Sequence, residues 1–576
     1  MATQTGSGQM VRALDMMATE TGSGQLVRAL DWKGAFWVAA GVPPLVLFSI
    51  GGIAGVAGKA AFVVWMLSMV MGFLQSFTYA EMAGMFRNKS GGASIYGATA
   101  WLRYSKLIAP LSVWSNWFAW SPVLSLGCVI ASGYILNALF PIPAAESQMV
   151  LDWLTANAGK TAEDGVAALT PAIRSWEALA FNIPGLGALH FNSTFVVGAV
   201  LMSIIFAIQH RGIAATASAQ RVLAIVVLVP LLLVGLVPLF NGSIDSTNIT
   251  GILPPTSSYS GVDGAWNLGG WTLFLGAMYI AAWSTYGFET AVCYTSELKN
   301  PRTDTFKAIF FAGLLCVVFF FLIPFVFQGV LGQAGMLAPG IIDGTGIAEA
   351  LGNMLGGNKV ITQVFVILMI LGLFLAIMTA MAGSSRTLYQ GSRDGWLPKY
   401  LSHVNRNGAP TGAMWTDFGF NLFLLALASD AGGYFYVLAI SNVGYILFNF
   451  LNLNAGWIHR IDSGHIERPW KAPAVLIGIN TVLAFVNLVF LGAGAKVWGY
   501  SNALWAGLIF AALIIPVFAY RHYVQDGGQF PKEAMAEMGL TGNDLGERKA
   551  GMRPYLTLAA GAVVVLWANW FFVLPV

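Results

Sequence analysis

The chain alternates long apolar runs with short polar segments over almost its entire length. A helix that crosses a membrane needs about 20 mostly apolar residues. This pattern predicts an all-α polytopic membrane protein with about twelve core helices and a thirteenth helix at the C-terminus. For the last run, the alternative is a hydrophobic tail that lies in the membrane interface. The thirteen runs are 34–57, 60–86, 105–140, 193–209, 217–240, 270–295, 305–331, 359–385, 412–428, 433–458, 474–494, 502–520 and 554–574.

Composition narrows the class of protein. Of the 576 residues, 57% are hydrophobic and 10% are charged, whereas soluble proteins carry about 25% charged residues. An ordinary soluble enzyme, a disordered chain and a nucleic-acid binder are therefore excluded. The three cysteines lie inside apolar runs and the six histidines lie in loops or at the ends of runs, so neither type has the spacing of a metal or catalytic cluster. We predict a protein that is not an enzyme and has no metal and no organic cofactor.

The placement of basic residues predicts the orientation. If the N-terminus is cytoplasmic, 24 of the 29 lysines and arginines fall in cytoplasmic segments and five in outer segments. Cytoplasmic loops carry such an excess. We predict a multi-pass protein of the plasma (inner) membrane with cytoplasmic segments at 1–33 and 521–553 and with Val576 outside. Residues 1–15 and 17–31 form a near-identical tandem repeat, which we interpret as an accidental duplication of the leader.

Three acidic residues fall inside or at the end of apolar runs. Glu289 lies midway along the sixth run, Glu81 lies about one turn from the cytoplasmic end of the second, and Glu297 closes the sixth. Ionisable groups in a membrane are functional candidates by default. Glu289 is either a proton or gate residue or a structural carboxylate bonded to a neighbouring helix. For Glu81 and Glu297 we expect pairing with nearby lysines and arginines.

The first predicted helix contains an interruption at Gly41-Val42-Pro43-Pro44. Proline lacks an N–H and disfavours the helical conformation in the residue before it. We expect the break at 41–44 and read 51–59, which contains four glycines, as the outer turn. The alternative for 41–44 is a proline kink without a ligand.

The sixth predicted helix contains a second interruption, Trp283-Ser284-Thr285-Tyr286-Gly287, before Glu289. Ser, Thr and Gly suit unwound backbone, and the alternative is simple aromatic packing. The two interruptions lie five helices apart, as an inverted repeat of two five-helix halves requires. We therefore predict repeats at 34–240 and 270–458, followed by helices eleven and twelve at 474–520. Interrupted helices in corresponding positions favour a secondary transporter.

At these residues the chain resembles the amino acid–polyamine–organocation transporter superfamily. The resemblance covers about residues 34–520 and rests on four landmarks in the expected order. These are Tyr79-Ala80-Glu81-Met82 with Ser90-Gly91-Gly92-Ala93-Ser94-Ile95-Tyr96; Gly287-Phe288-Glu289 with Glu297-Leu298-Lys299-Asn300-Pro301-Arg302; Ser385-Arg386 with Arg393-Asp394-Gly395-Trp396-Leu397-Pro398; and Arg468-Pro469-Trp470-Lys471-Ala472-Pro473.

The resemblance implies a five-plus-five inverted-repeat transporter fold that works by alternating access. It implies a substrate site between the breaks of helices one and six, where Gly41, Val42, Pro43 and Pro44 face the segment 283–287. Trp283 matches an aromatic residue that covers substrate in arginine–agmatine antiporters of the superfamily. Ser284, Thr285, Tyr286 and Gly287 would line the unwound segment.

Two departures from the family pattern bear on the substrate and the coupling ion. The glycine-rich run whose amides bind a substrate carboxylate in the family is replaced by a run containing Pro43 and Pro44, which have no N–H to donate. The lysine of proton-coupled members would fall near Val227, inside an apolar run. In the related fold Thr379, with Ala376 one turn before it, would contribute to an ion site. The coupling ion, H⁺ or Na⁺, and exchange without an ion both stay open.

The sequence therefore predicts a permease for amino acids or related small amine-bearing solutes, with the lipid bilayer and the solute as its partners and no nucleic acid. The oligomeric state is not predicted. A transporter of amines or polyamines without carboxylate recognition is the nearer alternative, because of the altered first break. A non-transporting membrane sensor is the remote one.

Overall fold

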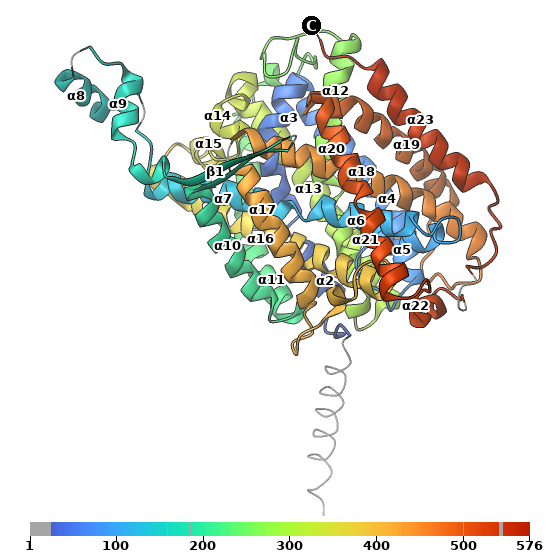
Figure 1. Cartoon of the computed structure of the whole chain (residues 1–576). Helices are drawn as coiled ribbons and strands as arrows, with labels where there is room; N and C mark the ends of the chain where they lie inside the picture. Colours follow the sequence, from blue (N-terminus) through green and yellow to red (C-terminus); the bar gives the residue numbers. More distant parts are fainter. Residues whose placement is uncertain are drawn as a thin grey trace, which may run out of the picture.

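The computed structural model describes residues 25–143, 145–157, 159–184, 186–429, 431–498, 500–540 and 545–575. The predicted tandem repeat at 1–31 lies mostly outside this part of the chain. Within it, the protein is a tight bundle of helices with one two-stranded hairpin (Figure 1).

The first half of the chain forms helices and the hairpin, with η marking 3₁₀-helices: α2 (Trp32–Ala39), η1 (Pro43–Phe48), α3 (Ile50–Ala57), η2 (Gly58–Ala60), α4 (Ala61–Met85), α5 (Ala93–Trp101), α6 (Ile108–Trp120), α7 (Val123–Leu139), α8 (Gln148–Ala156), α9 (Ala162–Leu169), η3 (Ala172–Arg174), β1 (Glu177–Ile183), β2 (Gly187–Asn192), α10 (Ser193–Gln209), α11 (Ile213–Asn241) and η4 (Ser246–Asn248).

The second half is helical, with one π-helix, η7: α12 (Leu268–Thr285), η5 (Gly287–Glu297), α13 (Pro301–Met336), α14 (Pro339–Ile342), α15 (Ile347–Met354), α16 (Lys359–Arg393), η6 (Lys399–Ser402), α17 (Thr411–Ala428), α18 (Ala431–Asp462), α19 (Ala474–Val497), α20 (Tyr500–Ala512), α21 (Ile514–Ala519), η7 (Tyr520–Gln525), α22 (Lys532–Glu537) and α23 (Arg553–Phe571).

Among the described residues, nine helical stretches are long and apolar enough to cross a membrane. Nine of the thirteen apolar runs correspond to these stretches, whereas the runs 34–57, 193–209, 270–295 and 412–428 have no such stretch of their own, although every run is largely helical. The helix Ser193–Gln209, for example, has only 17 residues. The nine are Ile50–Met85, Ile108–Leu139, Ile213–Asn241, Pro301–Met336, Lys359–Arg393, Gly433–Asp462, Ala474–Val497, Asn502–Gln525 and Arg553–Phe571. The all-α polytopic fold predicted from the sequence is confirmed, and its division into repeats at 34–240 and 270–458 stays a prediction.

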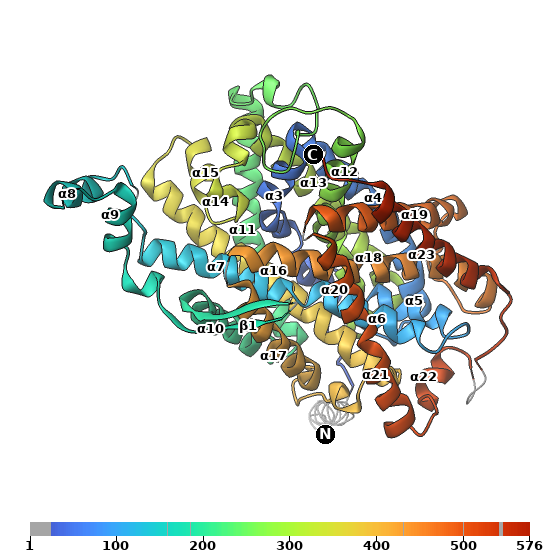
Figure 2. The same cartoon turned by 45° about the horizontal axis from the view of Figure 1, so that its top comes forward.

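The C-terminal helix α23 is one of these nine stretches. It runs along the edge of the bundle and packs against α19 (Figures 1 and 2). Its outer face exposes large apolar side chains, among them Leu556 and Val563, each 64% exposed. An apolar outer face beside a packed inner face is the pattern expected of a peripheral membrane helix.

The predicted outer turn at 51–59 is wrong. Residues Ile50–Ala57 form α3, and the chain turns at Gly58, which has a φ of +58°. The glycines that suggested a turn allow close helix packing instead: a Cβ at Gly51 would lie 2.3 Å from the Ile341 carbonyl oxygen, and one at Gly55 would lie 2.2 Å from Cδ1 of Tyr259. The first helix therefore has two α-helical halves, α2 and α3.

Candidate substrate site

The break in the first helix is longer than the predicted 41–44. Residues between Ala39 and Ile50 leave the α-helical path, and Pro43 and Pro44 begin the 3₁₀-helix η1. A proline in the first turn of such a helix removes an N–H that would have no internal partner. The two prolines thus fix where the backbone changes its helical form.

The break in the sixth helix falls at Tyr286. The α-helix α12 ends at Thr285 and continues from Gly287 as the 3₁₀-helix η5. The predicted segment 283–287 therefore spans the change from one helix type to the other. Both interruptions predicted from the sequence are real changes of backbone form.

The two breaks lie against each other. A Cβ built on Gly287 would be 3.2 Å from Cγ1 of Val42 and 2.4 Å from Cη2 of Trp120. The Ser284 hydroxyl donates to the Leu45 carbonyl at 3.4 Å. The absence of a side chain at Gly287 lets helices one and six meet and lets the Trp120 ring cover the junction.

Aromatic rings enclose this junction. Trp283 is 1% exposed, its Nε1 donates to the Ala119 carbonyl at 3.0 Å, and its ring centroid lies 5.9 Å from that of Phe48. Trp120 lies 5.9 Å from Tyr445, centroid to centroid. In this conformation the region between the breaks is closed on the sides that these rings occupy.

Glu289 lies beside the ring of Trp120 and is 1% exposed. Its Oε1 accepts a hydrogen bond from Trp120 Nε1 at 2.9 Å. Its Oε2 has no well-formed hydrogen bond within the described residues and lies beside Gly92 and Ala93, at the N-terminus of α5. A helix N-terminus favours a negative charge, so the site holds a carboxylate with one oxygen still able to accept.

A chain of buried side chains fixes Tyr286 to helices outside the break. The Tyr286 hydroxyl donates to Asn487 Oδ1 at 3.0 Å, and Asn487 Nδ2 donates to Asn449 Oδ1 at 2.7 Å. Asn449 in turn donates to Gln75 at 2.6 Å and to Tyr79 at 2.8 Å. Thr285 shares a 2.7 Å hydrogen bond with Ser68 of α4. These bonds hold the break of helix six against α4, α18 and α19.

The candidate ion site on α16 is occupied by protein atoms. Thr379 Oγ1 donates to the Val38 carbonyl at 2.6 Å and accepts from Gly41 N at 3.1 Å. The side-chain amide of Gln220, on α11, donates to both Val38 O, at 3.1 Å, and Thr379 Oγ1, at 2.9 Å. Ala376 is buried one turn before Thr379 and offers no polar side-chain atom.

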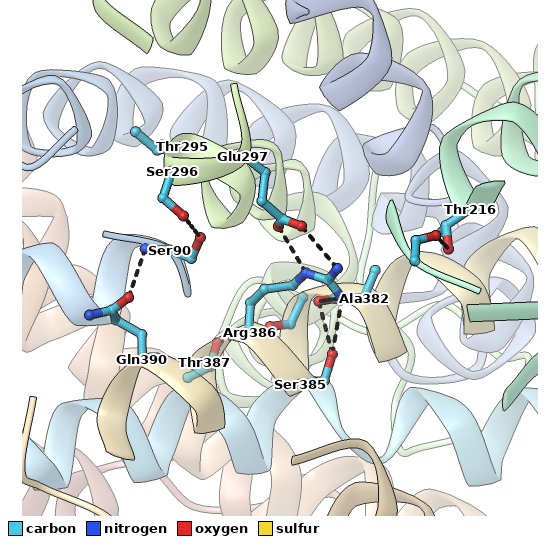
Figure 3. Close-up of polar contacts among 12 residues, drawn as sticks. Ser90, Thr216, Thr295, Ser296, Glu297, Ala382, Ser385, Arg386, Thr387 and Gln390 are labelled. Atoms are coloured by element: carbon cyan, nitrogen blue, oxygen red, sulfur yellow. Dashed lines mark hydrogen bonds and ion pairs between the residues drawn. The ribbon is translucent and has the colours of Figure 1, made fainter. Parts of the chain in front are cut away.

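The two acidic residues expected to pair with basic ones do so. Glu81 accepts from Arg460 at 2.6 and 3.0 Å and from Arg468 at 3.1 Å. Glu297 and Arg386 form a two-point ion pair with distances of 3.0 and 3.2 Å (Figure 3). Both groups of the Glu297–Arg386 pair are almost fully buried, so the predicted pairing is confirmed.

Beside this ion pair, several segments close the end of the bundle where α2 begins. Ala29 and Leu30 donate backbone hydrogen bonds to the Glu297 carbonyl, and Ser90 bonds to Ser296 (Figure 3). The fully buried Lys89 lies 2.5 Å from Asp394 and 3.5 Å from Glu537 of α22. A polar cavity of about 360 Å³ remains between these segments.

Sequence reasoning missed two residues of this arrangement. Trp120 gave no signal of its own, although it precedes the Ser121-Pro122 step at which helix three is kinked into α6 and α7. Gln220 was missed because the count along helix five pointed to Val227. Gln220 stands beside Arg221 near the start of the apolar run 217–240, so no local signal marks it as a site residue.

The sequence is similar to those of known amino acid permeases. The family model described as amino acid permease matches residues 30–518. The chain is 28% identical over 272 residues to the branched-chain amino acid permease BcaP of Lactococcus lactis, which covers 46% of this chain and 52% of that protein. It is 24% identical over 211 residues to the permease of the same name of Bacillus subtilis, covering 36% and 43%.

A third relative is the uncharacterized transporter lpg1691 of Legionella pneumophila, which is 28% identical over 152 residues, or 26% of this chain and 31% of that protein. The matches span about half or less of the length of these relatives.

Proposed function

Because the chain belongs to the amino acid permease family, we propose that it moves amino acids with apolar side chains across a membrane by alternating access. Membership of this family indicates a transporter rather than an enzyme. The observation that carries the proposal is the contact between the two helix breaks, where Val42 meets Gly287 beneath the rings of Trp120 and Trp283. Freed backbone at paired breaks is where transporters of this architecture bind their solutes.

The chemistry of the walls favours an apolar side chain on the substrate. Val42, Phe48, Trp120 and Trp283 surround the junction with apolar surface. Two of the relatives are named for branched-chain amino acids. Leucine, isoleucine and valine are therefore the proposed substrates.

We assign the amino group of the substrate to Glu289. Its Oε2 is the acceptor that stays without a well-formed hydrogen bond beside the break. A buried carboxylate gains most from a charged donor, because a charge-assisted hydrogen bond is about twice as strong as a neutral one. In this proposal Trp120 orients Glu289 through its other oxygen.

An amine without a carboxylate is a second candidate substrate, and the first break favours it. Pro43 and Pro44 have no N–H, while the N–H groups of Gly41, Val42 and Leu45 already donate to Thr379, Ala39 and Val42. No amide of this segment is left to bind a carboxylate in the present conformation. An amino acid substrate must therefore draw its carboxylate donors from a rearranged break or from helix six.

We further propose that no sodium ion binds between helices one and eight. The two donor hydrogens of the Gln220 amide satisfy Val38 O and Thr379 Oγ1, the two oxygens that a cation would need there. The proposed direction of insertion, with the N-terminus in the cytoplasm and the protein in the plasma membrane, rests on the distribution of lysine and arginine.

A binding series tests the substrate class. The purified protein is heated in detergent with leucine, isoleucine and valine, and with the amines that lack their carboxylate. A ligand that binds the native state raises the unfolding midpoint. Stabilisation by the amino acids alone supports the main proposal, and stabilisation by the amines alone supports the second candidate. Glu289→Gln should abolish stabilisation by either class.

A further inference from the structure

The hairpin between α7 and α10 has two faces of different chemistry. Strands β1 and β2 pair antiparallel, with Leu179 opposite Phe191, Phe181 opposite Leu189, and Ala180 opposite His190. Successive side chains of a strand point to opposite faces. One face of the hairpin therefore carries Leu179, Phe181, Leu189 and Phe191, and the other face carries small or polar residues at 180, 182, 188 and 190.

Only part of the apolar face is covered by protein. Strand β2 contacts α17 and α10, and Leu189 packs against the core. Strand β1 projects beyond these helices, and Leu179 and Phe181 are each 57% exposed. In both views the hairpin lies next to α10 and α17 (Figures 1 and 2).

The exposed part continues onto a surface that must meet lipid. The hairpin leads without a gap into α10, an apolar helix whose outer side exposes Val196, Val200 and Ile204, at 46%, 55% and 46%. The ring of Phe191 at the end of the hairpin contacts that of Phe195 in α10. A lipid layer around α10 therefore extends to the uncovered half of the hairpin's apolar face.

We infer that the hairpin is a membrane-surface element: Leu179 and Phe181 insert into the bilayer at its interface, while the face with Ala180 and His190 lies in water. Trp176, 47% exposed and directly before β1, is the residue type enriched at membrane interfaces. On the opposite face His190 bonds to Glu177 at 2.6 Å, a pair suited to water. The occupant of this surface is lipid, and the inference does not depend on the transported solute.

The chain offers a clean test, because its three native cysteines are all buried. Single-cysteine labelling with a nitroxide is made at Leu179→Cys and Phe181→Cys on the apolar face. Ala180→Cys and Asn182→Cys are the matched controls on the other face, since all four positions lie on exposed or half-exposed strand surface. Collision rates with oxygen, which partitions into lipid, and with a water-soluble nickel chelate are measured in phosphatidylcholine vesicles.

We expect the ratio of the oxygen collision rate to the nickel-chelate collision rate to be at least several-fold higher for labels at 179 and 181 than for labels at 180 and 182. Equal, nickel-dominated collisions at all four positions would overturn it, because the hairpin would then stand in water. Labels at 179 and 181 shielded from both reagents would also overturn it, since a second copy or another protein would then cover the face. Gel filtration of each variant establishes that the label leaves the fold intact.

Discussion

The side-chain amide of Gln220 lies 2.9 Å from the hydroxyl of Thr379 and bridges it to the Val38 carbonyl. Helices one, five and eight are joined at this point by uncharged hydrogen bonds. These hydrogen bonds attach helix one to helices five and eight without a bound ion.

Removal of the amide should weaken this junction. Gln220→Ala leaves the buried Val38 carbonyl and Thr379 hydroxyl short of partners, which costs about 1–3 kcal/mol. We expect a lower unfolding midpoint for this variant, and no change for Arg221→Ala, which alters the exposed neighbour on the same helix.

Replacement of sodium chloride by choline chloride should leave the midpoint of the unmodified protein unchanged. A sodium-dependent rise in the midpoint, lost in Thr379→Ala, would refute the assignment of Gln220.

Gly287 should tolerate no side chain. A methyl group there would lie 2.4 Å from the Trp120 ring, and overpacking of this kind costs about 1–3 kcal/mol. Because Trp120 also orients Glu289, we expect Gly287→Ala to reduce uptake at least tenfold and to lower the unfolding midpoint. Gly419→Ala is the matched control, since a Cβ at Gly419 meets nothing within 4 Å. Wild-type uptake by Gly287→Ala would contradict the proposed contact of the breaks.

The stability of the fold should depend on Glu297 and Arg386 being present together. Loss of one partner leaves a buried charge uncompensated, which costs about 3–5 kcal/mol. We expect Glu297→Gln to lower the unfolding midpoint strongly, and the double variant Glu297→Leu with Arg386→Met to recover much of the loss. Glu547→Gln, which removes an exposed pair with Lys549, should have little effect. Equal midpoints for Glu297→Gln and Glu547→Gln would show that the buried pair carries no such energy.

Docking of α22 should strengthen as the pH falls. Burial raises the pKa of Glu537, with a further rise from Asp394, while Lys89 and Arg393 lower it. A carboxyl group whose pKa is higher in the docked state binds its proton more tightly there, so acidification favours docking. Hydrogen exchange of the amides of α22, corrected for its intrinsic pH dependence, should slow as the pH is lowered from neutral toward the ordinary pKa of a glutamate carboxyl group.

In the same experiment Glu537→Gln should remove the pH dependence, whereas Glu547→Gln, which changes an exposed carboxylate, should keep it. Faster exchange at the lower pH would mean that the Glu537–Lys89 pair, rather than burial, controls the docking of α22.

The positions of the helices and of the two breaks were predictable from the sequence, because apolar runs, prolines and basic loops each determine the structure of the residues near them in the chain. Pro43 and Pro44 begin a 3₁₀-helix at the position where the sequence predicts a break. Glu81 and Glu297 form ion pairs with arginines, as the sequence predicts. Tertiary contact decided the rest. The glycines at 51 and 55 looked like turn residues, but they allow α3 to pack against Ile341 and Tyr259.

The site residues that escaped prediction are those whose role depends on a partner distant in sequence. Trp120 acts on Glu289, 169 positions later, and Gln220 acts on Thr379, 159 positions later. No local pattern encodes such pairs. The hairpin was also not predicted, because its alternation of apolar and polar residues is short and lies in a segment between two apolar runs.

We propose that this permease carries apolar amino acids through the junction of the two breaks without sodium. The most direct measurement is uptake of radiolabelled leucine by vesicles that contain the purified protein and are preloaded with unlabelled leucine. We predict rapid exchange, undiminished when choline replaces sodium, blocked by isoleucine and valine, and lost in Glu289→Gln. Exchange of the corresponding amine with no exchange of leucine, or leucine uptake that requires sodium, would contradict it.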